Sequence, residues 1–222
     1  MNTPVQRKLD RVIKFDERSR NFPIRATFKH TTPRSWKWKC DIYLDQGTEG
    51  ACTGFAVSHE AIARPCIVEG IDSQVARDVY HRAQQIDEWP GEDYEGSSVL
   101  AAMKAGKERG WYKEYRWAFG VDDLAITVSR YGPAVLGIYW YTGMFNTDNN
   151  GYIHATGSIA GGHAILCNGF NVKQKFFKLH NSWGRDWGLH GECKISYDDM
   201  DKLLQNQGEA CIPVLRTNPL II

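Results

Sequence analysis

The chain changes character near residue 120, and this change constrains the fold more than any other feature of the sequence. Three earlier segments, 52–65, 72–87 and 97–110, carry apolar residues at helical spacing. Later, short apolar runs separated by Gly- and Asn-rich turns predict strands at 134–140, 163–170, 175–181, 192–196 and 210–215. Because the helices and strands are segregated, the sequence predicts an α+β fold, with a helical half packed against an antiparallel β half.

The ends of these elements follow from capping residues. Asp72 is the expected N-cap of the second helix, and either Ser97 or Ser98 begins the third. A further short helix is expected at 197–206, with Asp198 as its cap. The chain should therefore divide into an N-terminal arm (1–32), a helical half (33–120) and a β half (121–222), with a binding cleft between the halves.

Composition excludes several classes of function. The 222 residues carry a formal net charge of +1 without a long run of like charges, so neither nucleic acid nor a membrane surface is an expected partner. The first thirty residues are rich in charge and lack the apolar core of a signal peptide. Six cysteines occur without a CxxC pair, which favours reduced thiols over disulfide bridges. We therefore expect a cytoplasmic protein and leave its oligomeric state open.

One of these cysteines, Cys52, has a setting that favours chemistry. It follows the Gly-rich turn "QGTEGA" and opens the first predicted helix. A lone cysteine in an apolar helix is usually a small core residue. At a helix N-terminus, however, free N–H groups and the positive end of the dipole lower a thiol pKa, and the thiolate is the attacking form. Cys52 is therefore a candidate nucleophile.

Partners for such a nucleophile lie far along the chain. His163 follows two glycines at the head of an apolar strand and could act as general base. Asn181, in "HNSWG", could orient the imidazole without adding charge, and Trp183 could shield their hydrogen bond from water. The amide of Gln46, with the Cys52 N–H, could stabilise an oxyanion. Each residue alone has an ordinary structural interpretation, as a core, turn or loop residue.

Together, the Gln46–Cys52 pair, the Gly-His strand head and "NSWG" resemble the papain-like cysteine peptidases. The resemblance extends to "EGSSVLAAMKAGKERGW", "GPAVLGIYW" and "NSWGRDWGLHGECKI", and it covers roughly residues 33–215. It implies that Cys52 is the nucleophile, His163 the general base and acid, Asn181 the orienting residue and Gln46 the oxyanion donor. The resemblance also implies an enzyme that requires no cofactor and whose partner is a peptide or protein substrate.

The resemblance also implies substrate-binding positions. Gly96 and Ser97 would line the non-primed subsites, while Ala134 and Ala164 would border a roomy apolar pocket for the substrate's second residue. Gly162 and Trp183 complete the implied binding set.

The sequence also departs from the family pattern. Glu49 and Tyr94 stand where the family carries two cysteines, and Thr53 replaces the Trp after the nucleophile. Only about thirty residues precede the matched region, so either the enzyme is made without a zymogen or the arm packs on the body.

Other interpretations remain open at this stage. The same machinery could serve transpeptidation, deamidation or cleavage of a cell-wall peptide, and a non-enzymatic descendant could only bind peptides. A metal cluster of His180, His190 and Cys193 is disfavoured because its spacing matches no standard zinc site.

Overall fold

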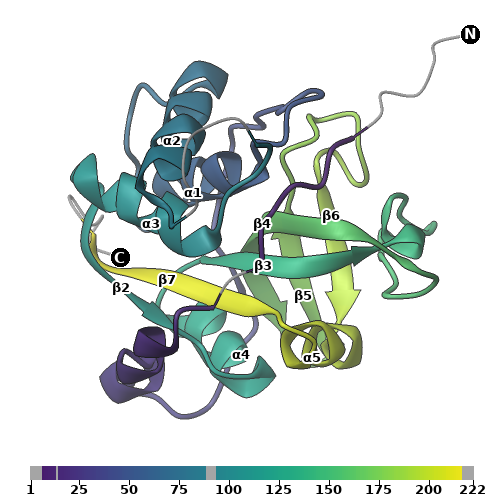
Figure 1. The fold of residues 1–222 in the computed structure, drawn as a ribbon. Helices are drawn as coiled ribbons and strands as arrows, with labels where there is room; N and C mark the ends of the chain where they lie inside the picture. The colour runs from purple at the N-terminus through teal and green to yellow at the C-terminus, as the bar shows by residue number, and fades with distance from the viewer. Residues whose placement is uncertain (1–6, 14, 89–93, 217–222) are drawn as a thin grey trace, which may run out of the picture.

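The computed structural model describes residues 7–13, 15–88 and 94–216, and helices cover both faces of one antiparallel sheet (Figure 1). One core cluster joins the first face to helices α1 (Cys52–Ile62), α2 (Ser73–Ile86) and α3 (Val99–Glu108). A second core cluster joins the opposite face to α4 (Val121–Arg130) and α5 (Tyr197–Gln205). Within the described ranges, no helix is long and apolar enough to cross a membrane.

The sheet has strand order β2-β7-β3-β4-β5-β6, and β1 pairs with β4. Its strands are β1 (Trp36–Lys37), β2 (Tyr112–Trp117), β3 (Ala134–Tyr141), β4 (Ile159–Asn171), β5 (Phe176–His180), β6 (Glu192–Ser196) and β7 (Glu209–Arg216). Three short 3-10 helices, η1 (Glu17–Asn21), η2 (Ile24–Thr27) and η3 (Thr142–Met144), complete the named elements. The central strands β3 and β4 are therefore covered on both faces, which explains why their sequences are almost continuously apolar.

The predicted α+β class and the predicted helices and later strands are confirmed. The side chain of Asp72 caps α2 as expected, and Ser98 rather than Ser97 caps α3. Asp198 is the wrong cap for α5, because the Ser196 side chain accepts the hydrogen bond from the Asp199 N–H. The sequence analysis missed the short strand β1, the three 3-10 helices, the helix α4 and the strand β2, which joins the sheet although it precedes residue 120.

Segment 7–13 of the N-terminal arm packs on the body of the protein. This packing is the second of the two alternatives that the sequence left open. Asp10 forms a parallel bridge with Gly162 on β4, and Arg11 forms one with Ser97 just before α3. Figure 1 shows this purple segment crossing the sheet at β4 and β3. The arm thus spans the junction between the helical half and the β half.

Candidate active site

Cys52 is the first residue of α1 and is fully buried. The preceding residue, Ala51, offers no side-chain cap, so the first N–H groups of the helix are not satisfied by a capping side chain. The backbone of Ala164 lies within hydrogen-bonding reach of the thiol. Because Ala164 directly follows His163 on β4, the fold brings the predicted nucleophile and the predicted base to the same point of the cleft.

The hydrogen bonds of Asn181 determine which nitrogen of His163 carries a proton. Its Oδ1 accepts from the Ser182 backbone N–H at 2.9 Å, so this atom must be the amide oxygen. The same oxygen lies 2.8 Å from His163 Nε2, which must therefore be the donor. Nδ1 of the neutral ring is left as an acceptor, and it has no hydrogen-bond partner among the described residues. His163 is thus held in the tautomer that can take a proton from a thiol.

Aromatic side chains enclose this imidazole. The ring centroids of Trp140 and Trp183 lie 4.8 and 5.1 Å from that of His163. Phe145 stacks on Trp183, with 5.9 Å between the ring centroids and an interplanar angle of 11°. His163, Asn181 and Trp183 are all essentially buried, so the His163–Asn181 hydrogen bond is kept from water. Trp183 occupies the shielding position suggested by the sequence.

Gln46 presents its amide to the same cleft. Its Oε1 accepts a 2.6 Å hydrogen bond from the Ser182 hydroxyl, which fixes the orientation of the amide. Its Nε2 donates to the carbonyl of Glu49 at 2.8 Å and, more weakly, to the carbonyl of Lys8 in the arm at 3.4 Å. Both acceptors are backbone carbonyls, the kind of group to which an oxyanion donor must donate, and the shorter bond stays within the turn that carries Gln46.

The protonation of this site differs from the sequence-based expectation. Burial raises the pKa of the Cys52 thiol to about 11, so the expectation of a lowered thiol pKa is wrong for this arm-bound arrangement. Burial lowers the pKa of His163 to about 4, and the hydrogen bond that His163 donates to Asn181 only partly opposes it. Both groups are therefore neutral near pH 7, because burial disfavours the thiolate and the imidazolium alike.

The glycines and Ser97 predicted to bind substrate all lie against the arm. The Ser97 carbonyl accepts from the Val12 N–H at 3.0 Å, and the Gly162 carbonyl accepts from the Arg11 N–H at 2.9 Å. A Cβ atom on Gly96 would collide with the Asp10 carbonyl, and one on Gly162 with the Arg11 carbonyl. These two glycines therefore allow an extended backbone to approach both walls of the cleft.

The two alanines of the predicted apolar pocket separate in the structure. Ala164 is paired with Gly137 in the β3–β4 ladder and belongs to the core cluster on the α1 side. Ala134 belongs to the cluster on the opposite face of the sheet, so the structure does not bring it to the cleft. The side chain beside Gly137 is instead a carboxylate, Glu209, which the sequence analysis missed.

A second thiol and imidazole meet elsewhere, with 3.8 Å between Cys40 Sγ and His180 Nε2. Nε2 of His180 is also 3.1 Å from the Ile42 carbonyl, which can only accept, so this nitrogen carries a proton and cannot take one from the thiol. The Cys40 thiol points toward the carbonyls of Ile42 and His59, each at 3.7 Å. Burial raises the pKa of Cys40 to about 12. This pair is therefore structural.

The described part of the chain contains no group of three or more His, Cys, Asp or Glu side chains that could hold a metal ion. Its six cysteines are all buried free thiols.

Other residues of the site were missed by the sequence analysis. Ser182 orients both Asn181, through its N–H, and Gln46, through its hydroxyl. Its place within "NSWG" was a usable signal. Asp10 and Arg11 gave no signal, because an arm has no periodicity that indicates what it covers.

Comparison with known proteins agrees with this geometry. The sequence profile of the papain family cysteine proteases matches residues 38–211. The chain is 34% identical over 89 residues to a cathepsin B-like cysteine proteinase of Schistosoma japonicum, covering 35% of this chain and 26% of the relative. It is 30% identical over 84 residues to cathepsin B-like cysteine proteinase 6 of Caenorhabditis elegans, covering 35% and 22%. The chain thus matches about a quarter of the length of these curated relatives.

Solved structures share the fold at low identity. Xylellain, a cysteine protease from Xylella fastidiosa, superposes with a TM-score of 0.72 at 18% identity, covering 97% of this chain and 100% of that one. Digestive procathepsin L 3 of Tenebrio molitor gives a TM-score of 0.62 at 16% identity, covering 95% and 77%.

Proposed function

The chain belongs to the papain family of cysteine proteases, and from this premise we propose that it hydrolyses peptide or amide bonds of a peptide or protein substrate. The observation that carries the proposal is the tautomer of His163. Asn181 accepts the proton of Nε2, and Nδ1 is left as a buried acceptor beside the start of α1. The next residue on β4, Ala164, has its backbone within hydrogen-bonding reach of the Cys52 thiol, so this acceptor lies on the part of the strand that meets the thiol.

The proposed reaction follows from the positions of these groups. Nδ1 of His163 takes the Cys52 proton, and the sulfur attacks the scissile carbonyl carbon. Gln46 Nε2 and the Cys52 N–H donate to the resulting oxyanion. The imidazolium gives its proton to the leaving amine, and a Cys52 thioester remains. His163 then takes a proton from water, the hydroxide released attacks the thioester, and the thiolate leaves and recovers the proton.

The arm must leave the cleft before a substrate can enter. Arg7 anchors it through an ion pair with Asp45 at 2.5 Å and a hydrogen bond from Nη2 to the Trp183 carbonyl at 2.8 Å. Both Asp45 and Trp183 flank the catalytic residues Gln46 and His163. The described structure therefore represents a closed form, and the Arg7→Ala variant is the natural background for an activity assay.

The decisive experiment uses the full chain and its Arg7→Ala variant with a library of fluorogenic peptides. Hydrolysis should be lost completely in Cys52→Ala. The matched control is Cys40→Ala, which removes the thiol of the structural pair and should keep the activity. Peptide binding without hydrolysis by either parent would contradict the proposal and leave a peptide-binding descendant.

A cytoplasmic location is also a proposal. It is supported by the six cysteines, each of which is a free thiol, as a reducing compartment requires. Fractionation of the native cells, with the protein detected by antibody, tests it.

A further inference from the structure

Helix α2 lies against the first turn of the helix that carries the nucleophile. Gly54 stands two residues after Cys52 in α1. A Cβ atom at this position would collide with two backbone atoms of α2, the Ala76 carbonyl oxygen and the Tyr80 nitrogen. The two helix backbones are therefore almost in contact, and a group anchored on α2 is held in a fixed relation to Cys52.

One anchor on α2 is an ion pair with the turn that precedes Cys52. Arg77 Nε donates to Glu49 Oε2 at 2.9 Å, and His81 Nε2 lies 3.5 Å from Glu49 Oε1. The Arg77 guanidinium also lies over the Phe55 ring of α1, 5.8 Å from its centroid. Each side chain of the Arg77–Glu49 pair is 33% exposed. A pair this exposed adds little to the free energy of unfolding, so its effect should appear in the position of the turn.

Glu49 in turn holds the proposed oxyanion donor. The amide of Gln46 has two hydrogens to donate from Nε2. One hydrogen bond, at 2.8 Å, goes to the Glu49 carbonyl, and a longer one, at 3.4 Å, goes to the Lys8 carbonyl of the arm. Glu49 thus fixes the amide through one hydrogen, and the other becomes available to an oxyanion when the arm departs. A misplacement of about 1 Å at such a group can reduce a rate about 100-fold.

Two further residues of α2 hold the backbone of segment 94–97, which contains the proposed substrate-binding residue Gly96. The Tyr80 hydroxyl accepts a hydrogen bond from the Gly96 N–H at 2.9 Å. Gln84 Nε2 donates to the Tyr94 carbonyl at 2.7 Å. Tyr80 and Gln84 are both buried, so these bonds are made away from water, where they are stronger.

Asp87, the C-cap of α2, holds two side chains of the same segment. Its two carboxylate oxygens accept hydrogen bonds from the Tyr94 hydroxyl at 2.6 Å and from the Ser97 hydroxyl at 2.9 Å. The Ser97 carbonyl accepts from the Val12 N–H of the arm. Asp87 therefore fixes a residue that binds extended backbone in the cleft.

The anchoring residues recur along α2 at intervals of three and four positions, so they lie on one face of the helix. They are Arg77, Tyr80, Gln84 and Asp87, and we call them the α2 face. Both residues that stand where the family carries cysteines, Glu49 and Tyr94, are attached to this face. The α2 face thus joins the turn before the nucleophile to the segment that lines the cleft.

We infer that the α2 face is a set of positioning residues with two separate effects on the reaction. The Arg77–Glu49 pair orients Gln46 and supports the chemical step. The rest of the α2 face orients segment 94–97 and supports substrate binding. This inference rests on the proposed function, because it assigns effects on kcat and KM to a peptidase.

The first test removes the ion pair in the Arg7→Ala background. Arg77→Ala and Glu49→Ala should each lower kcat about 10-fold and leave KM nearly unchanged, because an oxyanion donor acts mainly in the transition state. The double variant should lose no more than Glu49→Ala alone, since both changes act on the same contact. Glu49→Gln keeps an acceptor oxygen for Arg77 and should retain most of the activity. A raised KM with unchanged kcat would overturn the inference.

The second test removes acceptors from the rest of the α2 face. Tyr80→Phe deletes only the hydroxyl that accepts from the Gly96 N–H. It should raise KM about 10-fold and keep kcat within about twofold, because segment 94–97 holds substrate backbone equally before and during the reaction. Asp87→Ala should act in the same direction. If Asp87→Ala does not fold, as judged by circular dichroism, the conservative Tyr80→Phe carries the test. A lowered kcat with unchanged KM would contradict the assignment.

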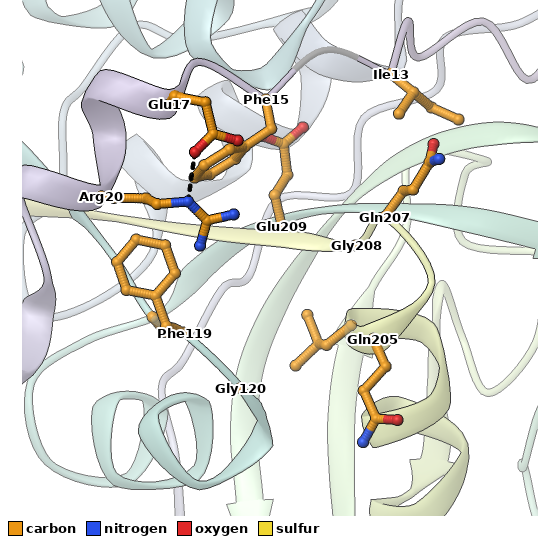
Figure 2. Close-up of a pocket in the computed structure, with 12 residues that line it drawn as sticks. Ile13, Phe15, Glu17, Arg20, Phe119, Gly120, Gln205, Gln207, Gly208 and Glu209 are labelled. Carbon is orange, nitrogen blue, oxygen red and sulfur yellow. Dashed lines mark hydrogen bonds and ion pairs between the residues drawn. The ribbon is translucent and has the colours of Figure 1, made fainter.

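Two solvent-accessible ion pairs serve as controls. Arg82→Ala removes, on α2 itself, a pair with Glu108 of α3 at 2.7 Å. Arg20→Ala removes a pair with Glu17 at 2.5 Å, and both of these residues line a cavity of about 550 Å³ between η1 and the start of β7 (Figure 2). Both variants should keep the parent kcat and KM. A loss in either control as large as that of Arg77→Ala would overturn the assignment to the α2 face.

Hydrogen exchange, followed by mass spectrometry of the full chain, tests the α2 face without turnover. Arg77→Ala should speed exchange about 10-fold in the turn 46–51, and Tyr80→Phe should do so in segment 94–97, each without changing the other segment. If this pattern appears but no chain hydrolyses peptides, the peptidase is overturned and the α2 face stands. If peptides are hydrolysed and neither the kinetic nor the exchange pattern appears, the α2 face is overturned and the peptidase stands.

Discussion

At the scale of the residue, Asn181 contributes more than a hydrogen bond. By accepting from both Ser182 and His163 it fixes the imidazole tautomer, and it does so without a negative charge that would favour imidazolium in the resting site. The two neutral groups, Cys52 and His163, are consistent with a covered site that becomes reactive only when the arm departs. We therefore propose Asn181 as a positioning residue that acts through His163.

Asn181→Ala should lower kcat about 10- to 100-fold, because the buried Nε2–H loses its acceptor and the ring is free to adopt the other tautomer. KM should change little, since the hydrogen bonds that Asn181 makes among the described residues go to His163, Ser182 and Gly191 and not to the arm. Steady-state kinetics in the Arg7→Ala background measures both constants. A rise in KM with unchanged kcat would contradict the positioning role.

At the scale of the element, the arm decides whether Cys52 can react. Arg7→Ala should raise the rate of Cys52 alkylation by iodoacetamide about tenfold, because it removes the hydrogen bonds to Asp45 and Trp183 that hold the arm. Arg20→Ala is the matched control, since its ion pair with Glu17 lies in η1 outside the arm segment. Peptide mass spectrometry identifies the labelled thiol. The idea fails if both variants react at the wild-type rate.

The N-cap of α5 gives a second prediction at this scale. Ser196→Ala should destabilise the protein by about 1 kcal/mol, because the Asp199 N–H loses its acceptor. Asp198→Ala should cost only about 0.3–0.5 kcal/mol, since Asp198 acts only through the helix dipole. Urea unfolding midpoints compare the two variants. A larger loss of stability in Asp198→Ala than in Ser196→Ala would show that Asp198 is the N-cap after all, as the sequence suggested.

At the scale of the whole molecule, buried histidine makes stability depend on pH. The pKa of His163 falls from 6.5 to about 4 on folding. Between pH 6.5 and pH 4, His163 is therefore mostly protonated in the unfolded chain and mostly neutral in the folded chain. The contribution of neutral, buried His163 to the free energy of unfolding is therefore complete above about pH 6.5 and is lost as the pH falls toward 4.

Between pH 7 and pH 5, His163 should account for about 2 kcal/mol of lost stability. His163→Gln should lose correspondingly less over this interval than the wild type. Urea unfolding of both chains at the two pH values measures the difference. Identical pH dependence would show that His163 does not titrate in this way.

How much the sequence determined is clear from particular residues. The period of the apolar residues identified α1–α3, β3 and β4, and local chemistry identified the Asp72 cap, because both signals lie within a few adjacent residues. The strand β2 was missed because its partner, β7, lies almost a hundred residues away and its own sequence is polar and aromatic. The division of the chain at residue 120 stays a prediction.

By itself, the sequence determined the identities of the site, since Cys52, His163, Asn181 and Gln46 stand in motifs that can be recognised without coordinates. Only the tertiary structure decided their state and surroundings. The raised thiol pKa, the arm across the cleft and the carboxylate of Glu209 all arise from segments that are distant in the chain. Burial and desolvation depend on what covers a group, and a linear pattern does not record what will fold over it.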